Sequence, residues 1–439
     1  MEDIIVIFNE IYKSINSFIG FQIIVKFISI WYWVFLPFVF LPFAIKAWFW
    51  WRRESWEKKQ EYTFLELIPS EEIVQPFNSM EQVFSTIWSI YSSTQGFRNL
   101  GKKYWRGRVP YSFCIEMMSN GPNSHILIRC LKEHKKSIET TLYAYYADLE
   151  IREVEDYTKS VPYNIPNKEW DMYGFDEILI KPDVYPIKTY EQFFEKKPEN
   201  IKQEKRIDPL NAFLEGMAML EEGEQFWIQA RISPVTSKDS DYMKRAKAIV
   251  DKLTNRGEKT VQSEEGGFIP PEMKLTARER EIVNAIQTKI GKLAFLTNIR
   301  GIYLAKREIF DKGKSALGEQ FFSGFNTQDL NAFKKLRRTK TKSYFYHIFT
   351  KHFIYLKKRQ IFRRYLLREK TLFPLESGPF ILNTEELATM FHLPIKVGTV
   401  GTNLPRVEAK KGEAPTKLPT GGGSDRKQQE ESPRNLPIE

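Results

Sequence analysis

The feature that most constrains this chain is an uncharged apolar run near its amino terminus, residues 27–45, which reads FISIWYWVFLPFVFLPFAI. As a helix rising about 1.5 Å per residue, this run would span roughly 28 Å, close to the hydrocarbon thickness of a bilayer. A soluble core helix seldom runs this long without a polar face, and a cleaved signal peptide would be shorter and followed by small residues. We therefore predict a transmembrane helix at 27–51, kinked at Pro37 and Pro42.

The flanks of the run predict its orientation. Tryptophans, which favour the membrane interface, crowd its two ends, and several basic residues follow it: Arg52, Arg53, Lys58 and Lys59. Because basic residues accumulate on the cytoplasmic side, we expect a single-pass protein of the inner membrane with the bulk of the chain in the cytoplasm. Apolar residues recur at helical spacing within residues 1–26, which favours an interfacial helix lying on the bilayer, with a second span as the alternative.

The rest of the chain predicts an α+β fold. Residues 60–160 show the order strand, helix, strand, strand, helix, strand, typical of a ferredoxin-like domain. A capping box at Ser79 and Gln82 marks the first helix, and a turn at Gly121–Pro122 separates the two middle strands. Residues 170–342 repeat the order less clearly, with helices expected at 314–325 and 327–336. We predict two ferredoxin-like domains, the second carrying a helical insertion at 235–291.

Two cysteines in 439 residues argue against a disulfide scaffold and fit a reducing compartment. The expected hairpin would place Cys114 and Cys130 nearly opposite each other on neighbouring strands, as reduced packing residues or, alternatively, as a redox pair. The five histidines are scattered, and no cysteine–histidine spacing suits zinc. No metal site and no cofactor are expected.

The net charge of +11 is local in origin. Residues 331–370 contain fourteen Lys and Arg and one acid, so the rest of the chain sums to −2. Within residues 343–395 we expect a basic helical segment and then a helix capped by Asn383 with Glu386. Three interpretations stay open for the block: contact with lipid headgroups, binding of nucleic acid, or a solvated helix packed on its own domain. The candidate polyanion-binding residues are Lys357, Lys358, Arg359, Arg363 and Arg364.

No catalytic motif is recognisable. Gly313-Lys314-Ser315 matches the end of a phosphate-binding loop, but Glu308 stands where that loop needs its first glycine, and an acid there would repel phosphate. The chain is therefore expected not to be an enzyme. An enzyme with a site assembled by the fold is the alternative, and nucleotide binding by residues 60–420 would distinguish the two. Residues 396–439 are too polar and too rich in Pro and Gly to order themselves, so a disordered linker and tail are expected.

Four phrases carry a family resemblance: YAYYADLEIREVEDY (143–157), DEILIKPDVYPIKTYEQF (176–193), FILNTEELATMFHLP (380–394) and LPRVEAKKGEAP (404–415). Together they resemble an uncharacterised membrane-anchored domain family, similar to the amino-terminal portion of conjugation-type traffic ATPases of type IV secretion systems. The resemblance covers roughly residues 60–420, and the chain lacks the Walker motifs of the motor.

The resemblance implies a non-catalytic, membrane-anchored component or docking platform of a conjugation-like translocation machine. Its expected partners are the lipid bilayer and a separate hexameric ATPase, with nucleic acid and a second copy of the chain as possible partners. A membrane-tethered nucleic-acid-binding module using the block at 331–370 is the alternative function.

Overall fold

The computed structural model describes residues 19–69, 76–90, 105, 109–193, 208–236, 240–254, 275–342, 350–369 and 379–394, without the side chains of 19–25, 31–35, 38–39 and 76. Of the interfacial helix expected at 1–26, residues 1–18 lie outside the described residues, and residues 19–26 form the start of the long helix α2 (Ile19–Glu57). The expected tail at 396–439 also lies outside the described residues.

The described strands form one nine-stranded sheet in the order β4-β1-β3-β2-β6-β7-β5-β8, with β9 alongside β7. Every pairing is antiparallel. The strands are β1 (Tyr62–Ile68), β2 (Phe113–Asn120), β3 (Asn123–Leu131), β4 (Glu150–Val154), β5 (Trp170–Leu179), β6 (Glu224–Val235), β7 (Ala294–Lys306), β8 (Phe333–Lys335) and β9 (Phe380–Asn383). The α+β class predicted from the sequence is confirmed.

The sheet consists of two halves with the same order of strands. In β4-β1-β3-β2 and in β8-β5-β7-β6, the fourth strand of each half lies beside the first, and the third lies beside the second. Residues 113–120 of β2 pair with residues 225–232 of β6 and join the halves. Seven of the eight residues of β2 are buried, so this strand is covered on both faces and has no solvent edge. The units expected at 60–160 and 170–342 therefore share one sheet.

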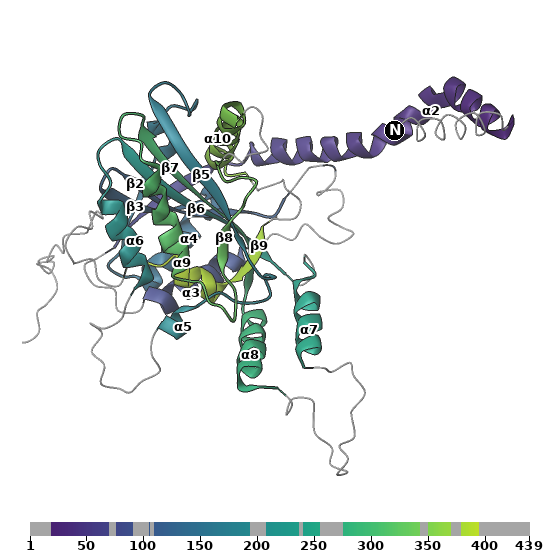
Figure 1. Ribbon diagram of the computed structural model, residues 1–439. Helices are drawn as coiled ribbons and strands as arrows, with labels where there is room; N and C mark the ends of the chain where they lie inside the picture. The colour runs from purple at the N-terminus through teal and green to yellow at the C-terminus, as the bar shows by residue number, and fades with distance from the viewer. Residues whose placement is uncertain are drawn as a thin grey trace, which may run out of the picture.

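The two faces of the sheet carry different layers (Figure 1). One face is covered by α3 (Pro76–Ser89), α4 (Lys135–Tyr145), α6 (Pro209–Ala218), α9 (Ala316–Ser323) and α11 (Thr384–Met390). Alternate strand residues such as Ile115, Phe226 and Tyr303 point into this layer and form its largest apolar cluster. The other face is covered by α10 (Thr350–Leu366), against Met118, Trp227 and Ile302.

The insertion between β6 and β7 contains two helices, α7 (Tyr242–Leu253) and α8 (Ala277–Gly291), below the body of the molecule in Figure 1. Ala246, Val250 and Ile286 bury their side chains between the pair. Thr276 and Glu279 form a capping box that begins α8. The short α5 (Tyr190–Phe193) precedes residues 194–207, which lie outside the described range.

The segment at 380–394 confirms one prediction and contains a strand that was not predicted. A capped helix was expected there, and α11 does begin with the predicted capping box of Asn383 and Glu386. Phe380–Asn383, however, forms β9, which pairs with residues 294–297 of β7. A strand of four residues is too short to show a recognisable alternation of apolar and polar residues in the sequence. All seven residues of α11 are buried, so this segment belongs to the folded body.

Two helix predictions are wrong. Residues 327–336 were expected to be helical but form a turn and then β8. Asn326 and Asn331 capture backbone amides with their side chains there, which competes with helix formation. Ser79 was expected to cap α3, but this helix already begins at Pro76, and Ser79 lies inside it.

The cysteine prediction is also wrong in its register. Cys114 lies opposite Arg129 in the β2–β3 pairing, and Cys130 lies opposite Thr63 of β1. Because side chains alternate along a strand, this one-residue offset places the two thiols on opposite faces of the sheet. Both are buried and free, and burial raises the pKa of Cys130 to about 12.

The amino-terminal helix α2 (Ile19–Glu57) extends from the body and contains Pro37 and Pro42 (Figure 1). Its described side chains include many exposed apolar ones, from Leu36, 42% exposed, to Phe43, 64% exposed. Among the described residues, no helix is both long and apolar enough to cross a membrane. The side chains of 31–35 and 38–39, inside the predicted span at 27–51, are outside the described residues, and that span stays a prediction.

Candidate functional site

The basic helix α10 is held on the sheet by one apolar face. Ile361, Phe362 and Tyr365 are buried against the sheet, and Tyr365 shares a hydrogen bond of 2.7 Å with the hydroxyl of Tyr157. Tyr365 also contacts Trp227, with 5.4 Å between the ring centroids. These contacts leave the basic side chains on the flanks and outer side of the helix.

Buried charges fix the chain just after α10. Arg368 adopts a φ of 49° at the turn and is buried. Its guanidinium donates to Glu116 at 3.0 and 3.2 Å and to Asp156 at 2.5 and 2.8 Å. Burial disfavours the charge of Arg368, but Glu116 and Asp156 outweigh this effect and raise its pKa. The same contacts lower the pKa of Asp156 against the effect of burial.

A second buried arginine holds the same end of α10. Arg300 of β7 donates to the backbone carbonyls of Arg364 at 2.6 Å and Glu369 at 2.7 Å, and its Nε lies 3.3 Å from Asp176. A cation suits the carbonyl end of a helix, where the helix dipole is negative. Burial lowers the pKa of Arg300, and Asp176 opposes this. The face under α10 therefore contains a charged network rather than an apolar core alone.

The five predicted polyanion-binding residues do not form one uniform patch. Lys358 pairs with Asp171 at 2.6 Å and also lies 5.4 Å from the ring centroid of Phe310, so its charge is already engaged. Lys357 donates to the carbonyl of Lys342 at 3.5 Å, and burial lowers its pKa. Arg363 is exposed, and Arg364 is half-buried on another side of the helix.

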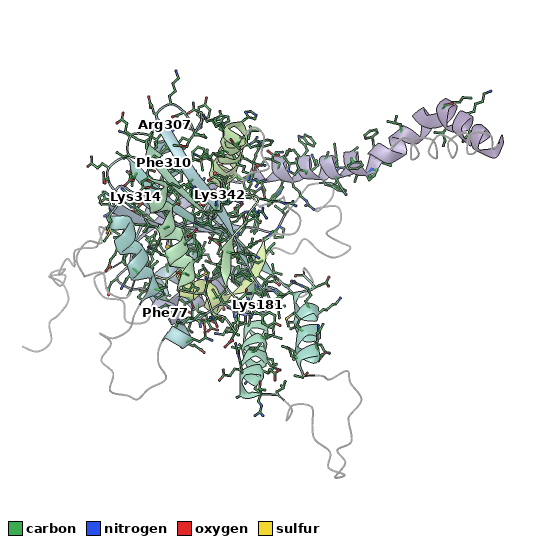
Figure 2. All side chains as sticks on the ribbon, in the orientation of Figure 1. Phe77, Lys181, Arg307, Phe310, Lys314 and Lys342 are labelled. Atoms are coloured by element: carbon green, nitrogen blue, oxygen red, sulfur yellow. The ribbon has the colours of Figure 1, made fainter. Side chains whose placement is uncertain are left out.

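Arg359, one of the five, lines a depression. This open depression of about 600 Å³ lies beside α10 and is lined by Asn164, Pro166, Asn167, Lys168, Arg307, Tyr355 and Arg359. Arg307 directly follows β7 (labelled in Figure 2), and its Nε donates to the carbonyl of Asn167 at 2.7 Å. The sequence prediction missed Lys168 and Arg307 because they lie outside the basic block and reach α10 only through the fold.

A second pocket lies where α2 meets the sheet. It has a volume of about 360 Å³ and is lined by residues of α2, by Arg129 and Arg231, and by residues 366–369 after α10. Glu57 in the last turn of α2 accepts a hydrogen bond of 3.1 Å from Arg231 of β6. Trp56 stacks on Tyr111 with 6.2 Å between the ring centroids. The ends of α2 and α10 therefore meet at one charged junction.

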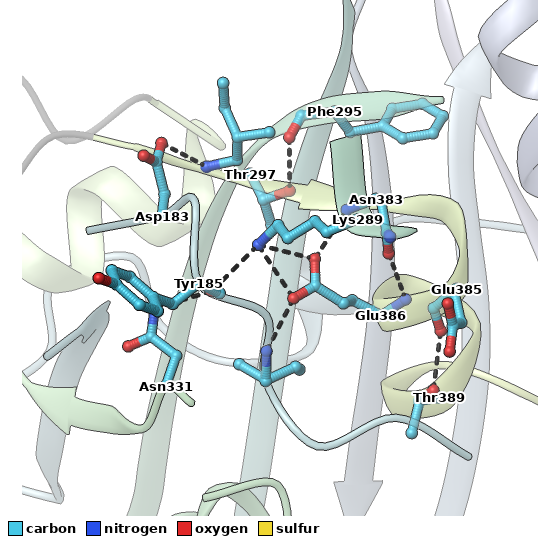
Figure 3. Close-up of polar contacts among 12 residues, drawn as sticks. Asp183, Tyr185, Lys289, Phe295, Thr297, Asn331, Asn383, Glu385, Glu386 and Thr389 are labelled. Atoms are coloured by element: carbon cyan, nitrogen blue, oxygen red, sulfur yellow. Dashed lines mark hydrogen bonds and ion pairs between the residues drawn. The ribbon is translucent and has the colours of Figure 1, made fainter. Parts of the chain in front are cut away.

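Glu386, the capping-box residue of α11, has a buried structural partner (Figure 3). Glu386 and Lys289 of α8 are fully buried and lie 2.9 Å apart. The Glu386 carboxylate also accepts from the backbone amides of Ile187 and Asn383, each at 2.9 Å. Burial raises the pKa of Glu386, and Lys289 opposes this. Every oxygen and the ammonium have protein partners, so this pair ties the insertion to the body.

The phosphate-loop-like sequence is not arranged for phosphate. Lys314 donates to Glu224 at 2.6 Å, and Glu221 is 3.4 Å away (Figure 2 labels Lys314). Asp311 caps the short 3₁₀ turn Lys312–Ser315 by accepting from Gly313 at 2.7 Å. Two acids around the lysine make this corner unsuited to an anion. In the described part of the chain, no three His, Cys, Asp or Glu residues gather as metal ligands.

No protein-family model and no curated protein matches this chain. The resemblance to the amino-terminal portion of conjugation-type ATPases therefore rests on the four sequence phrases alone.

Proposed function

We propose that this protein is a non-catalytic, membrane-anchored scaffold of a conjugation-like translocation machine, with α2 in the inner membrane and the sheet on the cytoplasmic side. The observation that carries the proposal is the surface of α2. Large apolar side chains such as Phe40, Phe43 and Trp50 are each more than half exposed along this helix. Exposed apolar area of this kind costs about 25 cal/mol per Å² in water, and an acyl-chain environment removes that cost.

The junction at the end of α2 supports a scaffold role. A scaffold anchor must transmit force to the domain that it holds and must fix the orientation of that domain. A flexible linker does not fix the orientation. Here α2 reaches Tyr62 of β1 through the short connection at 58–61, while Glu57 and Trp56 contact Arg231 and Tyr111. These contacts orient the helix relative to the sheet.

We further propose that each half of the sheet is a ferredoxin-like unit, since both have the strand order four-one-three-two with antiparallel neighbours. The sequence resemblance supports the same domain type and adds a separate hexameric ATPase as the partner that the scaffold recruits. Folds of this kind host many functions, so the partner must be tested directly.

Membrane extraction tests the anchor. After alkaline carbonate treatment of cell membranes, the full chain should stay in the pellet, and a variant lacking residues 27–51 should move to the supernatant. External protease on intact cells should leave the bulk of the chain uncut. Full solubility of the chain without detergent, or digestion from outside, would overturn the proposal.

Recruitment is tested by crosslinking in cells followed by detergent extraction and affinity purification of the tagged chain. A hexamer-forming ATPase should copurify, and the purified chain alone should not hydrolyse ATP. Recovery of no ATPase argues against a docking platform, and ATP hydrolysis by the chain alone contradicts the non-catalytic assignment.

A further inference from the structure

The depression beside α10 concentrates positive charge from three separate segments. Lys168 comes from the loop before β5, Arg307 follows β7, and Arg359 belongs to α10. Among the described residues, no carboxylate lines the depression, although Glu169 and Glu308 are sequence neighbours of its lining residues. Within the described part of the chain, no ion pair neutralises any of the three cations. By contrast, Asp171 neutralises Lys358, the residue next to Arg359. Neighbouring cations of α10 therefore differ in whether an acid pairs with them.

An aromatic ring lies beside these charges. Tyr355 is 45% exposed and precedes Arg359 by four residues, so both lie on one flank of α10. Arg363 follows by another four residues and extends the same flank with a further exposed guanidinium. The flank therefore presents a ring followed by two cations at intervals of about 6 Å, one helical turn each.

The remaining wall of the depression is an ordered loop. The side-chain oxygen of Asn167 accepts from the backbone amides of Glu169 at 2.9 Å and Trp170 at 2.7 Å. Its amide nitrogen donates to Asn164 at 3.1 Å. Since Arg307 also donates to the carbonyl of Asn167, the loop is held from both sides and its polar groups are positioned before any ligand arrives.

We infer that this depression binds single-stranded nucleic acid, with Tyr355 stacking on a base and with Lys168, Arg307 and Arg359 contacting phosphates. Single-strand sites combine a basic track with aromatic rings, because every base has a π face and every linkage has a charge. A lipid headgroup offers phosphate but no flat ring for Tyr355. The volume of about 600 Å³ also lies within the range of pockets that hold small ligands.

The inference is tested with the full 439-residue chain in phosphatidylcholine nanodiscs and a fluorescent oligothymidine of about 15 nucleotides, by anisotropy at several salt concentrations. Three phosphate contacts predict a slope of log K against log salt of about −2. The double variant Arg307→Gln, Arg359→Gln should reduce that slope by about 1.4. Tyr355→Ala should weaken binding roughly tenfold, and Tyr355→Phe should retain it within about twofold.

The matched control is Arg364→Gln. It removes the same charge from the same helix, about 140° around the axis from Arg359, and should change affinity by less than about twofold. Thermal unfolding of each variant confirms that the fold is kept. The inference is overturned if the oligonucleotide does not bind at about 50 mM salt. It is also overturned if Arg364→Gln weakens oligonucleotide binding as much as Arg359→Gln does, or if Tyr355→Ala binds the oligonucleotide normally. It is equally overturned if phosphatidylglycerol vesicles, and not the oligonucleotide, respond to the variants.

Discussion

The two faces of the sheet are stabilised in different ways. The face under α3, α4, α6, α9 and α11 is filled by apolar side chains, many of them phenylalanines. The face under α10 has a smaller apolar cluster and, beside it, the buried charges of Glu116, Arg368, Arg300 and Asp176. An apolar layer tolerates exchanges of similar volume, whereas a buried ion pair is costly to break and depends on each partner.

Asp176 and Glu177, adjacent residues of β5, show the contrast between the two faces most directly. Asp176 points toward the α10 face and has Arg300 at 3.3 Å. Glu177 points to the other face, where it is 2% exposed. Among the described residues, its Oε2 has no hydrogen-bond partner, and neither has either carboxylate oxygen of Asp176. Burial raises the pKa of Glu177 to about 8, and the nearby Lys335 offsets this only in part. The two adjacent carboxylates therefore differ: Asp176 has a direct cation partner, whereas burial dominates the pKa of Glu177.

The largest effect is expected from Arg368→Ala. Removing this guanidinium leaves Glu116 buried and without its cation, which should lower the free energy of unfolding by about 3–5 kcal/mol. Urea unfolding followed by circular dichroism measures the change. Arg363→Ala, at an exposed position of α10, is the control and should lower the free energy of unfolding by less than about 0.5 kcal/mol. Similar losses from the two variants would show that the charged network adds no more than a surface residue.

The next effect is a pH dependence from Glu177. Its folded pKa of about 8 exceeds the usual 4.5, so between these values the folded state holds a proton that the unfolded state has released. Stability should therefore fall as the pH rises through this window, by about 3 kcal/mol between roughly pH 5.5 and 8.5. Glu177→Gln should remove most of that slope in urea titrations at the two pH values. An unchanged slope in Glu177→Gln would mean that other groups cause it.

A smaller effect tests the packing of the apolar face. A Cβ added at Gly318 of α9 would lie 2.5 Å from the Cζ atom of Phe175, so Gly318→Ala should cost about 1–3 kcal/mol through overpacking. Phe175→Leu creates space at the same contact, and the double variant should lose less than the sum of the single losses. Strict additivity in a thermal-unfolding cycle would show that this contact relaxes freely.

The smallest effect compares two capping boxes. Asn383 caps α11 in the buried layer, and Thr276 caps α8 where both capping residues are exposed. Asn383→Ala should cost about 1–2 kcal/mol and Thr276→Ala about 0.5–1 kcal/mol, because only the first leaves buried amides unpaired. Chemical unfolding of both variants measures the two losses in free energy of unfolding and therefore their ratio. Equal costs would indicate that burial of the cap does not matter.

The sequence predicted what depends on local pattern. The order of helices and strands over residues 62–154, the N-cap at Asn383 and the basic helix at 350–366 all follow from period and capping chemistry. It failed at β8 and β9, which are strands of three and four residues that exist only through pairing with β5 and β7. Tertiary pairing overrides propensity for elements this short.

The candidate site was predictable only in part. Arg359 was found because it belongs to a dense basic run, but Lys168 and Arg307 are single cations in ordinary surroundings. Lys358 was chosen for its charge, while its partner Asp171 lies 187 residues earlier in the chain. Whether a basic side chain is paired with an acid depends on contacts between residues far apart in the sequence. No local sequence pattern encodes such contacts.

The short connection from α2 to β1 has a mechanical consequence. β1 is an inner strand, with six residue pairs to β3 and five to β4. Tension arriving along α2 would enter at one end of this strand and load both ladders in shear, so that many hydrogen bonds must yield together rather than one after another. A body attached through an inner strand therefore resists pulling better than one attached through an edge strand.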